Sequence, residues 1–249
     1  IVNPSIGLKN FYNPYGAVFL FPIFFWLFKQ YIISLNIRYL IFSLFILGLI
    51  IQFQMAFGIP ILIATVVLLG YLLVKRGRLI HFLSYFILLI PLSTFIIFDI
   101  KHSGLQLNAL IQFVNREGNS SLDVLSISGD RIKAIIFDSF DQLSPGKNFL
   151  TVFYAVFFIG GFIFAVKRSV FPKITYWLFG YLFLSFWIIS LFYSGGVGNY
   201  FWPFLPLMVI IFCSFYKVIK KEVFIPVFII LYLVNFYIGI SAILDFKTD

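Results

Sequence analysis

Three side chains suited to acid–base or phosphate chemistry stand together at the end of one apolar run. In the stretch FIIFDIKHSG, Asp99, Lys101 and His102 follow a run of mostly apolar residues. A carboxylate close to hydrocarbon is costly unless it is paired, and Lys101 or His102 can pair with it. One interpretation is a local ion pair that ends a helix. The other is a site for a lipid head group, in which Lys101 and a protonated His102 contact the phosphate and Asp99 orients them.

A second polar group lies in the stretch SGGVGNYFWPFLPLM. Its glycines let the backbone approach a ligand closely, and Asn199 and Tyr200 supply polar groups beside it. Pro203 and Pro206 remove hydrogen bonds from the helix that follows, which is tolerated where neighbours or a cavity satisfy the freed carbonyls. Asn199 and Tyr200 are therefore candidate substrate-binding residues. The alternative is an ordinary belt of aromatic residues at a membrane interface.

The composition indicates what kind of molecule positions these groups. Of the 249 residues, 62% are hydrophobic and 11% are charged, and the mean hydropathy is +1.06. Soluble domains carry about 25% charged residues. We therefore expect a single all-α domain over residues 1–249, a polytopic bundle of transmembrane helices in contact with membrane lipids.

Runs of about 20 apolar residues can cross the hydrocarbon as helices. The sequence predicts eight such spans, and a single long connection over residues 99–147. The expected spans are 12–28, 39–54, 56–74, 79–98, 148–166, 174–193, 199–216 and 223–244.

The charges between the spans predict an orientation. Four short connections hold most of the basic residues, whereas the connections at 52–56 and 194–198 carry no charge. Basic loops lie on the cytoplasmic side of membranes, so we expect Asp99, the loop 99–147 and both ends of the chain outside, at a plasma membrane. The net charge of +9 is explained in this way, and no nucleic-acid partner is expected. The basic residues concerned are Lys29, Arg38, Lys75, Arg76, Arg78, Lys167, Arg168, Lys173, Lys217, Lys220 and Lys221.

The long connection is expected to contain two short amphipathic helices at the membrane interface. Apolar residues recur at helical spacing from Leu107 to Val114 and again from Ile132 to Leu143. The segment between them, NREGNSSLDVLSISGD, has the composition of a turn-rich connection. The two helices either floor a cavity or merely cover the ends of the bundle.

Motifs of soluble enzymes and metal sites are absent from the sequence. There is no phosphate-binding glycine loop, no HExxH and no Cys/His metal spacing, so no metal and no cofactor are expected. The two histidines, His81 and His102, fall near opposite membrane faces, and His81 is expected to be an interfacial residue. The single cysteine, Cys213, lies within an apolar run.

Four segments together resemble a known class of membrane enzyme. FYNPYGAVFLFPIFFWLFK, GLIIQFQMAFGIPIL, FDIKH and GNYFWPFLPLM occur in the order and spacing of the later membrane region of bacterial GT-C glycosyltransferases. The likeness is to the dolichyl-phosphate-mannose-protein mannosyltransferase and aminoarabinose transferase branch, glycosyltransferase family 39. Asp99, Lys101 and His102 match its Asp-Leu-Arg-His-like sequence with Lys in place of Arg. Tyr200, Pro203 and Pro206 match its Tyr-Leu-Pro-x-Leu-Pro-like sequence.

The resemblance implies transfer of a sugar from a polyprenyl-phosphate donor to a lipid, glycan or protein acceptor outside the membrane. It implies that Lys101 and His102 stabilise the charge of the departing polyprenyl phosphate. The catalytic carboxylate of that family lies in its first outer loop, and no acid precedes Asp99 here. We therefore expect a C-terminal fragment without a catalytic residue of its own.

Two other classes remain open. A polysaccharide polymerase or ligase also has many spans and a long outer loop, although the loop 99–147 is not enriched in basic residues. A transporter or flippase is expected to keep polar groups near mid-membrane and to show an internal repeat, and the sequence indicates neither.

Overall fold

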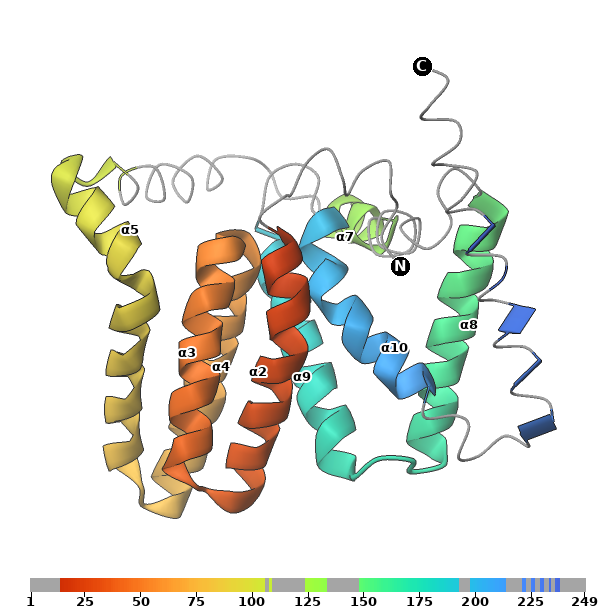
Figure 1. Ribbon diagram of the computed structural model, residues 1–249, viewed down its shortest axis with the longest axis horizontal. Coiled ribbons are helices and arrows are strands. Elements are labelled where there is room, and N and C mark those ends of the chain that lie inside the picture. Colours follow the sequence, from red (N-terminus) through yellow and green to blue (C-terminus); the bar gives the residue numbers. More distant parts are fainter. Residues whose placement is uncertain are drawn as a thin grey trace.

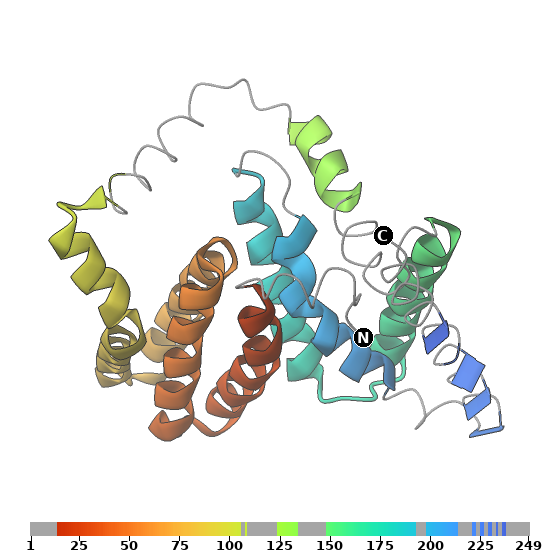
Figure 2. The same ribbon diagram turned by 45° about the horizontal axis from the view of Figure 1, so that its top comes forward.

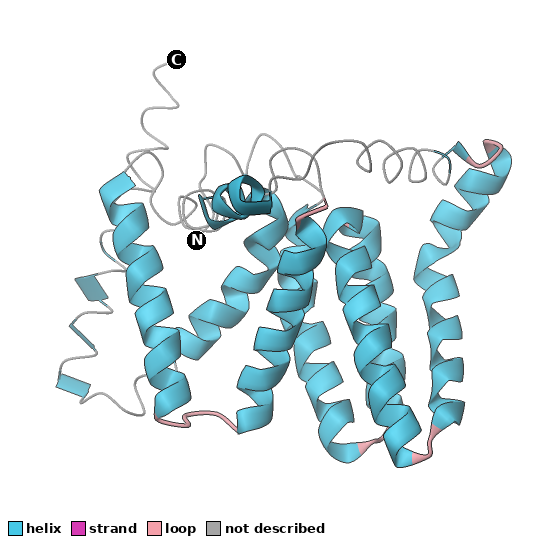
Figure 3. Cartoon of the chain, turned by 180° about the vertical axis from the view of Figure 1, so that it is seen from behind, coloured by secondary structure: helices cyan, strands magenta, loops and turns pink. Residues whose placement is uncertain are grey.

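The computed structural model describes residues 14–105, 108, 124–133, 148–192 and 198–213, together with residues 221, 222, 225, 226, 229, 230, 233, 236 and 237. All regular structure in these residues is helical, which confirms the all-α class (Figure 3). The elements in chain order are α2 (Pro14–Ser34), α3 (Ile37–Phe53), α4 (Met55–Arg76), the 3-10 helix η1 (Leu79–Leu88), α5 (Leu89–Lys101), α7 (Val124–Lys133), α8 (Asn148–Lys167), α9 (Lys173–Ser190), the 3-10 helix η4 (Gly198–Phe204) and α10 (Leu205–Cys213).

Membrane-spanning helices dominate this part of the chain. Among the described residues, four helical segments are long and apolar enough to cross a membrane: Tyr15–Ser34, Met55–Arg76, Leu79–Lys101 and Lys173–Ser190. Shorter apolar helices lie at Ile37–Phe53 and Tyr200–Ile210. The chain is therefore a membrane-embedded helical bundle. The expected run 223–244 falls mostly outside the described residues.

Successive helices run in alternating directions and give the bundle two distinct ends (Figure 1). The connections at 35–36, 77–78 and 168–172 lie at the lower end in Figure 1, and basic residues flank all three in the sequence. We call this the basic end. We call the opposite end the far end. It carries η4, α7 and the last turn of α5. The flanking basic residues are Arg38, Lys75, Arg76, Arg78, Lys167, Arg168 and Lys173.

Local sequence signals set the helix boundaries near the basic end. The side chain of Asn36 accepts a hydrogen bond from the backbone N–H of Arg38 at 3.1 Å and so caps the start of α3. Helix α4 ends at Gly77, which adopts a left-handed conformation with φ of 63°. The backbone N–H of Arg78 then donates to the carbonyl of Leu73 at 3.0 Å, as expected for a glycine-terminated helix.

At the far end, α3 and α4 are separated by a single residue, Gln54, whose side chain is buried. The two expected spans 39–54 and 56–74 thus form a tight hairpin. The two helices meet so closely that a Cβ on Gly58 would lie 2.8 Å from the Cα of Ile51. Glycine at this position is therefore a requirement of the hairpin.

Part of the buried core is a cluster of phenylalanine rings in the half of the bundle near the far end. The ring of Phe204, at the end of η4, lies 5.0 Å from that of Phe21 on α2, 5.4 Å from that of Phe57 on α4 and 5.1 Å from that of Phe183 on α9. All three contacts are edge-to-face, the geometry that aromatic pairs favour. Phe186 of α9 adds a ring at 5.2 Å from Phe57. The 3-10 helix η4 is thus inserted between three spans.

The described helices form a row. Helix α5 lies at one edge and packs on α3 and η1, whereas α8 lies toward the other and packs on α10, with the described pieces of residues 221–237 beyond it (Figures 1 and 2). Helices α2, α4 and α9 lie between them, with η4 packed against α2 and α4.

One expectation for the long connection was wrong. Residues 124–130, expected in a turn-rich segment, belong to helix α7. A tertiary contact accounts for this: Arg131 of α7 is buried, and its Nε donates to the carbonyl oxygen of Ser190 at 3.2 Å. The arginine thereby caps the carboxyl end of α9, where a cation is favoured. The expected helix at 107–114, and most of that at 132–143, lie outside the described residues.

The cluster yields a stability prediction. Phe204→Ala leaves a cavity between three spans and is expected to lower the free energy of unfolding by about 3 kcal/mol. Phe19→Ala is the matched control, because Phe19 is 69% exposed on the helix that carries Phe21, and a change below about 0.5 kcal/mol is expected there. Thermal unfolding in detergent, followed by tryptophan fluorescence, measures both. Equal losses would contradict the central role of Phe204.

Candidate functional site

The position of α5 depends on one close contact with α3. Gly48 has no side chain, and a Cβ at this position would lie 2.3 Å from Cγ of Pro91. Beside it, the Gln52 amide nitrogen donates to the carbonyl of Pro91 and, at 2.9 Å, to Oγ1 of Thr94. Small residues and interhelical hydrogen bonds are the contacts that hold helices together in lipid. Gly48 and Gln52 therefore fix the direction in which α5 continues.

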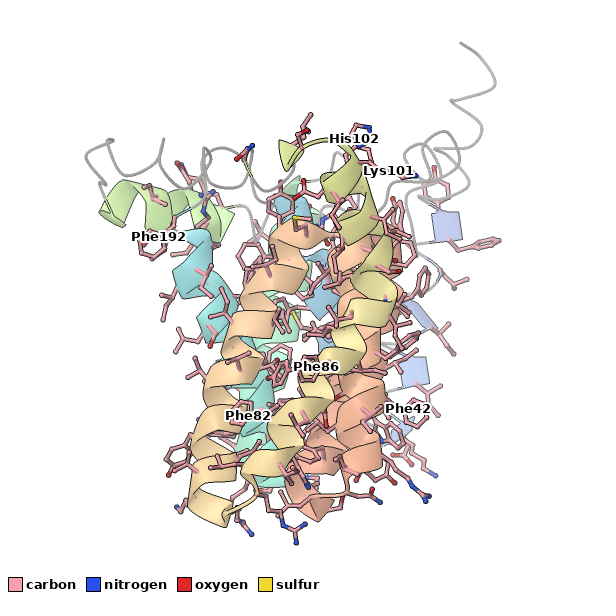
Figure 4. All side chains as sticks on the ribbon, turned by 90° about the vertical axis from the view of Figure 1, so that its left-hand side faces the viewer. Phe42, Phe82, Phe86, Lys101, His102 and Phe192 are labelled. Carbon is pink, nitrogen blue, oxygen red and sulfur yellow. The ribbon has the colours of Figure 1, made fainter. Side chains whose placement is uncertain are left out.

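Beyond this contact α5 stands apart from the rest of the described bundle. Ile96, Ile97, Phe98 and Ile100 are all exposed, although consecutive residues point to different sides of a helix. A helix that is apolar on every side is suited to hydrocarbon surroundings. Among the described residues, this half of α5 therefore presents several of its sides to lipid. Figure 4 shows Lys101 and His102 at its upper end, above Phe82 and Phe86.

The end of α5 holds the imidazole of His102 in a defined orientation. Its ring stacks on that of Phe98 with centroids 4.0 Å apart, and Nδ1 lies 2.8 Å from the carbonyl oxygen of Phe98. A carbonyl oxygen can only accept, so Nδ1 carries the hydrogen in this contact. The other ring nitrogen, Nε2, is thereby left to face a ligand. The helix ends at this point, where the backbone N–H of Gly104 donates to the carbonyl of Asp99 at 2.8 Å.

The three charged residues do not all face the same way. Residues two apart lie on opposite sides of a helix, so Asp99 and Lys101 point away from each other, whereas Phe98 and Lys101 are neighbours. Because His102 stacks on Phe98, it lies on the side of Lys101. Lys101 and His102, both exposed, form what we call the cationic end of α5. The hypothesis that Asp99 orients them stays a prediction.

The second expected group lies elsewhere at the same end. Tyr200, in η4, packs half-buried against the aromatic core. Helices α2, α3 and α4 stand between it and α5 (Figures 1 and 2). Asn199 also belongs to η4, and its side chain lies outside what the structure describes. The structure therefore brings Lys101 and His102 together but does not join Tyr200 to them.

A further polar pair lies near the basic end. His81, expected at the interface, is buried, and its Nδ1 lies 2.9 Å from the hydroxyl of the fully buried Tyr31. The two residues are 50 positions apart, which is why sequence reasoning missed the pair. The signal available was the spacing of His81 and Ser84, two polar residues three apart within an otherwise apolar run.

These features define an integral membrane protein of the all-α class, with a lysine and a histidine exposed at one helix end. Comparison with protein-family models, curated proteins and solved structures finds no match for the chain. No group of three or more His, Cys, Asp or Glu suited to a metal ion occurs among the described residues.

The Gly48–Pro91 contact can be tested by one added methyl group. Gly48→Ala is expected to force α5 away from α3 and to destabilise the protein by about 1–3 kcal/mol, the usual cost of overpacking. Gly180→Ala on α9 is the control, since a Cβ there meets nothing within 4 Å. Circular dichroism during titration with sodium dodecyl sulfate compares the two variants. Unchanged unfolding of Gly48→Ala would show that the contact does not hold α5.

Proposed function

We propose that this protein takes part in transferring a sugar from a polyprenyl-phosphate donor to a lipid, glycan or protein acceptor. In this proposal it is a GT-C-like membrane glycosyltransferase, and the cationic end of α5 holds the donor phosphate. The observation that carries the proposal is the exposure of Lys101 and His102 at the tip of a helix whose preceding residues Ile96, Ile97, Phe98 and Ile100 are also exposed. The resemblance of FDIKH to the corresponding motif of glycosyltransferase family 39 supports it.

The chemistry of such a donor fits both parts of α5. A polyprenyl chain is hydrocarbon and can lie along the lipid-exposed half of the helix, while its phosphate must stay where hydrocarbon meets water. Lys101 and protonated His102 can each donate a charge-assisted hydrogen bond to that phosphate. When an acceptor attacks the anomeric carbon, the bond to the phosphate oxygen breaks and polyprenyl phosphate leaves. Lys101 and His102 then stabilise its added negative charge.

The orientation of this reaction follows from the basic end. Basic residues favour the cytoplasmic side, so the proposal puts the cationic end of α5 outside a bacterial plasma membrane. Polyprenyl-linked sugars would be consumed at that face.

Transport is a second candidate, and the buried His81–Tyr31 pair favours it. An ionisable side chain inside a membrane segment is expensive and is commonly part of a substrate or proton path. The sequence alone did not indicate such a group.

A binding measurement tests the first candidate. The K101Q/H102Q variant in nanodiscs of neutral lipid is expected to bind farnesyl phosphate about tenfold more weakly, because two charge-assisted contacts are lost. K133Q is the control, since Lys133 is an exposed cation of the same end on α7. Farnesol, which lacks the phosphate, should bind K101Q/H102Q and the unmodified protein alike. Unchanged farnesyl phosphate affinity in K101Q/H102Q would exclude the proposed phosphate site.

A further inference from the structure

Four polar side chains gather inside the bundle between the basic end and mid-span. Tyr31 and His81 are hydrogen-bonded to each other. Close by on η1, the hydroxyls of Ser84 and Tyr85 are buried and have no hydrogen-bond partner within the part of the chain that the structure describes. We call these four residues the inner polar cluster. It is separate from the cationic end of α5, which lies at the other end of the bundle.

The 3-10 form of η1 aligns this cluster. Side chains three residues apart are eclipsed in a 3-10 helix, so His81 and Ser84 lie on one edge, and both are buried. The hydroxyl of Tyr85 lies close enough to those of Tyr31 and of Tyr181 on α9 to interact with them electrostatically. Tyr181 lies halfway along α9 and donates to the carbonyl of Ala64 at 2.8 Å. Polar groups thus continue from the surface at the basic end to the middle of the spans.

Leaving these hydroxyls unsatisfied would be costly. Burial of a hydroxyl without a hydrogen bond costs roughly 1–3 kcal/mol in proteins, and η1 carries two such groups. Buried sites that are polar hold water, whereas dry cavities in proteins are apolar. His81 retains a small exposed fraction, and its backbone N–H donates to the carbonyl of Arg78 at the basic end.

We propose that the inner polar cluster is a hydrated site, in which water entering from the basic end binds Ser84 and Tyr85 and reaches the His81–Tyr31 pair. The rings of the phenylalanine cluster around Phe204 lie nearer the far end and carry no polar atom, although Tyr15, Gln54 and Trp202 bury polar atoms of their own at that end. The site is thus a water-accessible crevice that opens at the basic end, where His81 can exchange a proton with water.

Charged and ionisable groups around His81 are few. The charge of Arg78 is close enough to interact electrostatically with both His81 and Tyr31. The helices packed on η1 contribute only groups that are exposed, half-buried or at the opposite end of the bundle. These are Arg38 and Tyr39 of α3, Tyr71, Lys75 and Arg76 of α4, and Asp99 and Lys101 of α5.

Cysteine labelling tests the crevice. In a Cys213→Ser background, Ser84→Cys and Leu88→Cys place a thiol at two positions of η1 that are equally buried, each 8% exposed. A small water-soluble methanethiosulfonate reagent, supplied at the basic end, is expected to modify S84C at least about tenfold faster than L88C, because the thiolate forms only in contact with water. Ser34→Cys, exposed at the same end, confirms that the reagent arrives. Equal, slow labelling of S84C and L88C would overturn the proposal.

A second measurement needs no substitution in the cluster. The chain has only two histidines, so in histidine-labelled protein the rings of His81 and His102 give two resolvable solid-state NMR signals, and His102→Gln assigns them. Magnetisation transfer from water is expected to reach His81 about as fast as the exposed His102. Transfer to His81 at the slow rate of the buried core would show a dry site.

Discussion

The packing of Phe204 against three spans is the contact on which the rest of the bundle depends. Lipid tails are as apolar as phenylalanine, so burying a ring away from lipid contributes little by itself, and close packing has to hold the helices together. Phe204 provides it because its edge-to-face contacts reach α2, α4 and α9 at once. Through this ring, a segment with the composition of a loop becomes the centre of the molecule.

The contrast between the two halves of the bundle follows from this cluster. Near the far end the rings of the cluster carry no polar atom, and the buried polar groups of that end, among them Gln54 and Arg131, lie around them. Near the basic end the interior contains hydroxyls and an imidazole among apolar side chains.

Helix α5 illustrates how small contacts near one end decide geometry at the other. Its only described attachments are to α3 and η1, through the Gly48–Pro91 contact and the hydrogen bonds of Gln52. The remainder of the helix lies in lipid and ends in Lys101 and His102. The contacts that hold α5 are at Pro91 and Thr94. The position of Lys101 and His102 relative to the membrane surface is therefore set by residues two to three helical turns before them.

The sequence by itself determined the class of the protein, the location of most helices and the grouping of Asp99, Lys101 and His102. These features depend on composition, on apolar run length and on neighbours in the chain, all of which can be read locally. Only the tertiary structure decided that Tyr200 lies apart from Lys101 and His102, and that residues 124–130 are helical beside a buried arginine contact. The same holds for His81, which meets Tyr31 across 50 residues. Such contacts arise from the packing of helices, and in a chain whose spans are nearly all apolar no periodic pattern specifies which faces meet.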